Sequence, residues 1–240
     1  MLATEISLIS SFTINETIKH ICSGKFLLPT VQEGNIWSPN DVVRLFDSLV
    51  RRHSLGSFVF WSVGREKMKD YKFYPLWRDQ HESCNQNELN VSLGGAENVL
   101  VVLDGKRRLA SLYVALKGIN GSGMPGESCD NDIHLHERKL HFNLLSKPAE
   151  DEPYRGFKFL TSLEASGQRD ENTHWFEIGK VLEFRTVGDA NNYLRDSNLI
   201  GIQCSSHWML KFFKVFNEKG IITGHLETCE EVGRAFMVLL

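Results

Sequence analysis

The sequence predicts an α/β fold of the α+β type, with one body over residues 1–185 followed by a small helical segment over residues 186–240. The first observation behind this prediction is that amphipathic helix patterns alternate with short apolar or aromatic runs typical of strands. The second is composition, because a chain of 240 residues with 42% apolar and 24% charged residues can bury a full hydrophobic core.

Two helices are predicted within the first fifty residues, each with a recognisable start. Thr13 and Glu16 have the spacing of a capping box ahead of an apolar stripe, and Gly24 is placed to end that helix. Ser38 and Pro39 provide an N-cap followed by proline at the first helical position, and apolar residues then recur at helical spacing.

Four further segments have the composition or alternation of strands: residues 57–63, 71–74, 139–145 and 157–160. In the third of these, Leu140, Phe142 and Leu144 fall on one face, which predicts a half-exposed strand, and the fourth is expected to pair with it. The polar stretches at residues 77–97 and 118–131 are rich in asparagine or glycine and are predicted to be loops.

The last part of the chain is predicted to be helical. Asp189 is placed to cap one helix, and the apolar residues from Trp208 to Phe216 belong to another. Thr228 and Glu231 have capping-box spacing for a third helix, in which the apolar run extends to Leu240. Because so short a helix needs packing to be stable, we expect this segment to be incomplete and to be covered by a partner chain or a further domain.

Charge and cysteine content narrow the class of protein. A net charge of −3 excludes a generally basic nucleic-acid-binding protein, so contact with DNA would need a local patch. Residues 51–53, 65–72 and 106–108 are candidate patches, although a basic cluster of this kind, taken singly, is more often a solvated surface than a DNA site. Five scattered cysteines without a CxxC pair indicate reduced thiols and a cytoplasmic protein. No apolar run reaches the roughly 18 residues of a membrane span, so no membrane partner is expected.

The strand-to-helix junction around Gly105 carries the strongest functional signal. An apolar run before Asp104 is typical of a strand buried on both faces, and a helical stripe follows the glycine. The first N–H groups of a helix and its dipole favour an anion, and Lys106, Arg107 and Arg108 add positive charge at the same point. A phosphate group is the expected ligand, while a solvated basic helix start after an ordinary turn is the alternative that these residues leave open.

Three segments taken together resemble a known family. They are Leu28-Pro29 with Gln32 and Trp37, then Asp47-Ser48-Leu49 with Leu55-Gly56 and Trp61, then Asp104-Gly105-Lys106-Arg107-Arg108-Leu109. In order and spacing they resemble the N-terminal domain of the GmrS/GmrD-type modification-dependent restriction proteins, whose motifs run LPxFQRxYxW, SxLxGxPIGxFxLW and DGQQRLTTL. The resemblance extends over about residues 5–200.

This resemblance implies a ParB/sulfiredoxin-like fold, a mixed sheet with flanking helices that forms a nucleotide-binding domain over residues 1–185. It also implies nucleoside triphosphate (NTP) hydrolysis, sensing of modified DNA and defence against phage. The implied catalytic residues are Asp104, Arg108 and Gln32. Gly105 and Arg108 match the motif and are the implied nucleotide-binding residues. Lys106 and Arg107 are expected to join them because of their charge at the helix start, and Trp37 because its ring could stack on a base. Asp104 would also be the ligand of a Mg²⁺ ion brought by the triphosphate.

The sequence departs from the family motifs at several positions. Lys106 and Arg107 replace two glutamines, and Glu33 replaces the arginine that follows Gln32. These changes leave open a second function, that of a catalytically degenerate regulatory or DNA-contacting module with the same fold. The C-terminal family motif Phe-x-Arg-x-Asn is matched only at Phe236. The nuclease domain that often follows in the family is expected to be absent from this chain and to act, if at all, as a partner.

Other chemistries find little support in the sequence. It has no G-x-S-x-G elbow, Walker A sequence or HExxH motif, which excludes the commonest hydrolase and P-loop interpretations. The group Cys129, His134, His136 and His141 fits no common zinc spacing. Trp37 and Trp61 are compatible both with stacking on a base and with an ordinary place in the core.

Overall fold

The computed structural model describes residues 8–29, 37–64, 66, 68, 71, 73–76, 98–118, 138–147, 156–168, 170–218 and 222–227. The chain forms two compact units. The first comprises residues 1–35, 56–110 and 219–240, and the second comprises residues 36–55 and 111–218. The two units therefore alternate along the chain, and their bounds do not follow the predicted division between residues 185 and 186.

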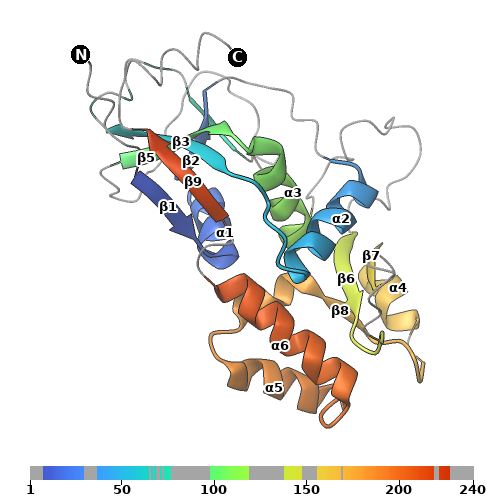
Figure 1. Ribbon diagram of the computed structural model, residues 1–240. Coiled ribbons are helices and arrows are strands. Elements are labelled where there is room, and N and C mark those ends of the chain that lie inside the picture. The colour runs from blue at the N-terminus through green and yellow to red at the C-terminus, as the bar shows by residue number, and fades with distance from the viewer. Residues whose placement is uncertain are drawn as a thin grey trace, which may run out of the picture. The chain divides into compact units, whose positions relative to one another are not determined.

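The first unit contains a six-stranded mixed sheet with the strand order β1-β9-β3-β5-β2-β4 (Figure 1). Its strands are β1 (Leu8–Phe12), β2 (Phe26–Leu28), β3 (Phe58–Gly64), β4 (Tyr74–Pro75), β5 (Asn98–Asp104) and β9 (Ile222–Glu227). The pairs β2–β5 and β3–β9 are parallel, whereas β1–β9, β2–β4 and β3–β5 are antiparallel. This mixed sheet, together with the helices described below, confirms the α+β fold class.

Both faces of β5 are buried, as its apolar run predicts. On one face, a cluster joins alternate residues of β5 to neighbouring strands: Leu27, Trp61, Val63, Phe73, Val99, Val101 and Leu103. On the other face, Phe26 lies opposite Leu100 and Phe60 lies opposite Val102, and the rings of Phe26 and Phe60 stack with their centroids 5.2 Å apart. The strand that leads into the candidate site is thus fixed by the core on both sides.

Helix α1 (Ile14–Cys22) covers the face that carries Phe26. The predicted capping box is present, because the Thr13 hydroxyl accepts from the Glu16 N–H at 2.9 Å and the Glu16 carboxylate accepts from the Thr13 N–H at 2.8 Å. Three isoleucines form the buried stripe of the helix. The ring of His20 packs against Phe26 with the centroids 5.4 Å apart. Gly24 follows with φ +66°, the left-handed conformation that ends many helices.

The second unit is built on a three-stranded antiparallel sheet with the order β7-β6-β8. Its strands are β6 (Lys139–Asn143), β7 (Phe157–Leu160) and β8 (Trp175–Glu177). Its helices are α2 (Pro39–Val50), α4 (Ser162–Gly167), the 3₁₀ helix η3 (Ile178–Glu183), α5 (Val187–Asp196) and α6 (Gln203–Asn217). Helices α5 and α6 lie side by side in Figure 1. The predicted helix start at Ser38 is confirmed. Helix α5 begins earlier than predicted, because its N-cap is Thr186 and Asp189 completes the capping box from the third helical position.

Aromatic rings hold this second unit together. The Phe142 ring on β6 lies 4.7 Å from the Phe157 ring on β7 and 5.0 Å from the Phe212 ring on α6, centroid to centroid. Phe46 joins α2 to the same group, at 6.2 Å from Phe157 and 6.5 Å from Phe216. Because buried phenylalanines contribute large apolar areas, these contacts fix α2 and α6 against the sheet.

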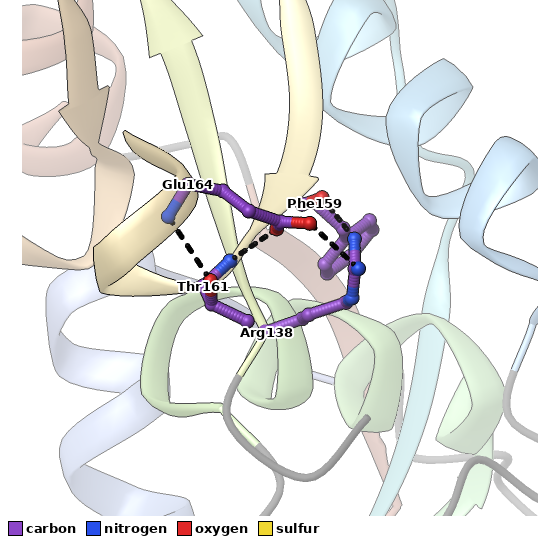
Figure 2. Close-up of polar contacts among 4 residues, drawn as sticks. All are labelled: Arg138, Phe159, Thr161 and Glu164. Atoms are coloured by element: carbon purple, nitrogen blue, oxygen red, sulfur yellow. Dashed lines mark hydrogen bonds and ion pairs between the residues drawn. The ribbon is translucent and has the colours of Figure 1, made fainter. Parts of the chain in front are cut away.

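Hydrogen bonds from nearby residues fix the start of helix α4. Thr161 and Glu164 form a second reciprocal capping box, and the other Glu164 oxygen accepts from Nη2 of Arg138 at 2.8 Å (Figure 2). Nη1 of the same guanidinium donates to the Phe159 carbonyl at 3.3 Å. Arg138 therefore ties the start of β6 both to β7 and to the first turn of α4.

Three predictions about elements are wrong. The strand expected at residues 71–74 is reduced to Tyr74–Pro75 and pairs with β2. The face of β6 opposite Leu140 is less exposed than predicted, because His141 is buried there, while Lys139 and Asn143 are half-buried. Residues 222–227 are not helical but form β9, since they find two strand partners in the first unit.

Several predicted segments lie outside the described residues, namely the loops at residues 77–97 and 119–131 and the helix after Thr228. In the ranges that are described, no helix combines the length and the apolar character that crossing a membrane requires.

Candidate functional site

The strand-to-helix junction has the predicted geometry. β5 ends at Asp104, Gly105 has φ +91°, and α3 (Lys106–Lys117) begins at the next residue. The Gly105 carbonyl accepts the first helical hydrogen bond, from the Leu109 N–H at 3.1 Å. The N–H groups of residues 106–108 consequently precede the first hydrogen bond of the helix, and they lie at the positive end of its dipole.

Phe58, the first residue of β3, explains why position 105 is glycine. A Cβ atom added to Gly105 would lie 2.2 Å from Cδ1 and 2.7 Å from Cε1 of the buried Phe58 ring. Such distances are not found in real structures, so the turn can pass this ring only without a side chain. The positive φ imposes the same requirement independently, because left-handed backbone is costly for residues with a Cβ.

Arg108 connects the junction to the segment before β3. Its Nη2 donates to the Ser57 carbonyl at 2.8 Å and lies 3.3 Å from Oδ2 of Asp104, and its Cζ lies 4.4 Å from the centroid of the Phe58 ring. Only 17% of its side chain is exposed, against 64% for Asp104. Arg108 therefore fixes the turn and the carboxylate in place, whatever further contact it makes with a ligand.

Gly56 permits this approach of Arg108. It has φ +78°, and a Cβ at this position would lie 2.7 Å from Nη1 of Arg108. Gly56 and β3, which form the last part of the second sequence motif, thus lie against Arg108 of the third motif.

The charges of the first turn of α3 are distributed unevenly. Arg107 is exposed, whereas Lys106 is half-buried. Burial lowers the pKa of the Lys106 ammonium below its ordinary value, and repulsion by Arg107 lowers it further, while the Asp104 carboxylate acts in the opposite direction. An anion bound beside these residues would remove that repulsion.

The predicted site residues are brought together only in part. Asp104, Gly105, Lys106, Arg107 and Arg108 form one continuous turn and helix start. Gln32 and Glu33 lie outside the described residues. Trp37 is half-buried just before the Ser38 N-cap and belongs to the second compact unit, so its role in stacking on a base stays a prediction.

Ser57 and Phe58 were not identified as site residues from the sequence. Ser57 takes part through its backbone carbonyl, for which no side-chain pattern exists. Phe58 reads as a core residue, and it is fully buried. The signal that was available is Gly56, because a glycine ahead of a strand often marks a close approach of another group.

Within the described turn, one carboxylate is placed to hold a metal. Asp104 is the acidic residue at the turn, and its exposed side chain can supply oxygen ligands. Mg²⁺ often needs only one or two protein carboxylates when phosphates supply further oxygens, so Asp104 fits an ion that arrives with a nucleotide. Among the residues that the structure describes, no group of three or more His, Cys, Asp or Glu side chains is arranged to hold a metal by itself.

Comparison with known proteins agrees with the motifs. No curated protein matches the sequence. Residues 14–229 match the family described as the GmrSD restriction endonuclease, N-terminal domain. That match spans most of the 240 residues and includes the junction at Gly105, the β3 segment and the helices of the second unit. The chain therefore belongs to the family of GmrSD restriction endonuclease N-terminal domains and is a component of a restriction or phage-defence protein.

Proposed function

We propose that the turn at Asp104–Gly105 and the first turn of α3 bind the phosphates of a nucleoside triphosphate, within a protein that restricts foreign DNA. The observation that carries this proposal is the packing of Phe58 against Gly105, which fixes a helix N-terminus directly after a strand buried on both faces. A rigid helix start of this kind presents backbone N–H groups to an anion without a cost of rearrangement.

Each residue at the turn has a distinct part in the proposed site. The N–H groups of residues 106–108 would donate to phosphate oxygens, and the ammonium of Lys106 and the guanidinium of Arg107 would neutralise their charge. Asp104 would hold Mg²⁺ or a ribose hydroxyl. Arg108 would act chiefly by holding Asp104 and Ser57 in place, because its guanidinium already contacts both.

Hydrolysis is the stronger form of this proposal. It needs Asp104 to orient a metal-bound water and a nearby cation to stabilise the developing charge on the transferred phosphoryl group. The alternative function is that of a regulatory or DNA-contacting module of the same fold that does not hydrolyse nucleotide. The ion pair between Asp104 and Arg108 favours this alternative function, since a carboxylate already paired at 3.3 Å is a weaker metal ligand.

Isothermal titration calorimetry with each of the four NTPs and Mg²⁺ tests the binding step. The variants Lys106→Gln and Arg107→Gln are expected to weaken binding about tenfold each, as is typical of a lost charge-assisted contact. Lys117→Gln is the matched control, because it removes the same charge from an exposed position at the other end of α3.

Turnover is measured separately as phosphate release by the wild-type chain and by Asp104→Asn. Release that depends on Asp104 supports hydrolysis, and binding without release supports the regulatory module. If the wild-type chain binds no NTP, or if Lys117→Gln weakens binding as much as Lys106→Gln does, the phosphate site proposed here is wrong. Arg108→Ala is a poor test, because this change also removes the contacts that hold the turn.

A further inference from the structure

A second group of cations lies in the second compact unit, where α2 ends and α6 passes it. Arg51, Arg52 and His53 directly follow α2. Lys211 of α6 lies among them, close enough that both arginines repel its ammonium and that Asp47 of α2 attracts it. Lys214 is exposed one helical turn further along α6. We name Arg51, Arg52, His53, Lys211 and Lys214 the α2–α6 basic surface.

Two carboxylates hold the arginines of this surface without cancelling its charge. Nε of Arg51 lies 3.0 Å from Oδ2 of Asp47, whose side chain is nearly buried, and the Arg52 guanidinium pairs with Glu218. Among the residues that the structure describes, four permanent cations of this surface therefore face two carboxylates. Arg52 keeps 56% of its side chain exposed despite its ion pair, so its charge is open to an anion from solvent.

The backbone conformation of Arg52 indicates that an arginine is kept at this helix end for the function of its side chain. Its φ is +61°, in the left-handed region. The His53 N–H donates to the Ser48 carbonyl at 2.8 Å and the Arg52 N–H to the Leu49 carbonyl at 2.9 Å, the hydrogen-bond pattern in which glycine is strongly preferred at this position. Strain that persists where glycine would relieve it points to a functional side chain.

Two other described helices end with the same pair of hydrogen bonds and support this comparison. At the end of α1 the left-handed residue is Gly24, and at the end of α5 it is Asn198, the two residue types that adopt this conformation most readily. Of these three helix ends, only that of α2 places a long cationic side chain in the left-handed position.

The α6 side of the surface is held rigidly. Nε1 of Trp208 donates to the Ser146 carbonyl at 2.8 Å, and the Lys211 ammonium lies 5.2 Å from the centroid of the Trp208 ring. The ring therefore orients the lysine beside the arginines, although burial and the repulsion of Arg51 and Arg52 disfavour its charge. Cations crowded in this way are stabilised when an anion binds between them.

We propose that the α2–α6 basic surface binds the phosphate backbone of double-stranded DNA. The cations are spread along the end of one helix and the side of another, which suits a succession of phosphates better than one small anion. The net charge of −3 makes such a local surface necessary for any contact with DNA. The proposal rests on membership of a restriction family and does not depend on nucleotide binding at Asp104. Contacts to phosphate carry no base information, so binding here is independent of sequence.

The test is fluorescence anisotropy of a labelled DNA duplex, titrated without nucleotide between about 50 and 200 mM salt. Arg52→Gly is the central variant, because it removes the cation and also relieves the left-handed backbone, so the chain is expected to fold at least as well. Arg52→Gly and Lys214→Gln are each expected to weaken binding roughly threefold to tenfold and to make the plot of log affinity against log salt shallower by about 0.9.

Arg195→Gln on α5 is the matched control, since Arg195 is exposed in the same unit and loses the same charge. The surface is supported if this control binds DNA like the wild-type chain and Arg52→Lys retains most of the affinity. It is overturned if the wild-type chain binds no duplex at the lowest salt, or if Arg52→Gly and Lys214→Gln bind as tightly as Arg195→Gln. A failure of the nucleotide site would leave these results unchanged, so the two proposals are tested independently.

Discussion

Replacement of Gly105 by alanine tests two constraints on residue 105, the positive φ of its backbone and the contact with the Phe58 ring. The first is the backbone, since φ +91° costs a residue with a Cβ about 1–2 kcal/mol. The second is the Phe58 ring, because a Cβ 2.2 Å from its Cδ1 forces the buried ring or the backbone to shift, at about 1–3 kcal/mol. The variant Gly105→Ala is therefore expected to lose about 2–5 kcal/mol, a large part of the roughly 5–15 kcal/mol of a typical domain.

Three other glycines provide matched controls for these terms. Gly201 has φ +84° with open space around its Cβ position, so Gly201→Ala measures the backbone cost alone. Gly156 has no positive φ, but its Cβ would lie 2.2 Å from Cε2 of Phe142, so Gly156→Ala measures the clash with a buried ring. Gly167 has neither constraint, and Gly167→Ala is expected to be neutral or to stabilise by up to about 1 kcal/mol.

Urea denaturation followed by peptide-resolved amide hydrogen exchange is the appropriate assay, because Gly105 belongs to the first unit and the three controls to the second. The loss in Gly105→Ala should approach the sum of the losses in Gly201→Ala and Gly156→Ala. If it equals the loss in Gly201→Ala alone, the Phe58 contact does not constrain the turn, and the rigid helix start on which the phosphate site depends is refuted.

Three further predictions concern the rest of the fold. Burial lowers the folded pKa of His141 below 6.5 and the unfolded chain keeps the ordinary value, so the second unit should lose stability as pH falls below about 6.5. His141→Asn should flatten that dependence in urea titrations at pH 7.5 and pH 5.5, and an unchanged slope would contradict it. Thr161→Ala should cost about 1 kcal/mol by removing the α4 cap, while Thr161→Ser should cost little, as thermal melts would show. Arg52→Gly should raise the stability of the second unit by up to about 1 kcal/mol, and a clear loss in urea denaturation would mean that the left-handed backbone there carries no strain.

Local signals in the sequence predicted much of the secondary structure. The capping residues Thr13 and Glu16, the Ser38-Pro39 pair and the glycine at position 105 each act within a few residues of the element that they begin. For the same reason the sequence predicts the strand-to-helix turn at Gly105 correctly, since strand, glycine and helix start are contiguous.

What the sequence could not predict depends on contacts between distant residues. His141 is buried where β6 pairs with β8, which comes more than 30 residues later in the chain. The restraint of Arg108 comes from the Ser57 carbonyl, 51 positions away along the chain. The left-handed backbone of Arg52 is also hidden in the sequence, because a glycine would signal it and an arginine does not.

The position of β9 near the end of the described chain affects how the protein folds during synthesis. β1 lies at one edge of the large sheet and pairs only with β9, with Leu8 opposite Leu226. A nascent chain leaving the ribosome would therefore carry β1 and one edge of β3 without partners until almost all of the described chain has been synthesised. Unpaired strand edges invite aggregation, so we expect the yield of folded protein to depend on chaperones and on slow translation. A chain that ends before residue 222 would lose the strand that pairs with β1.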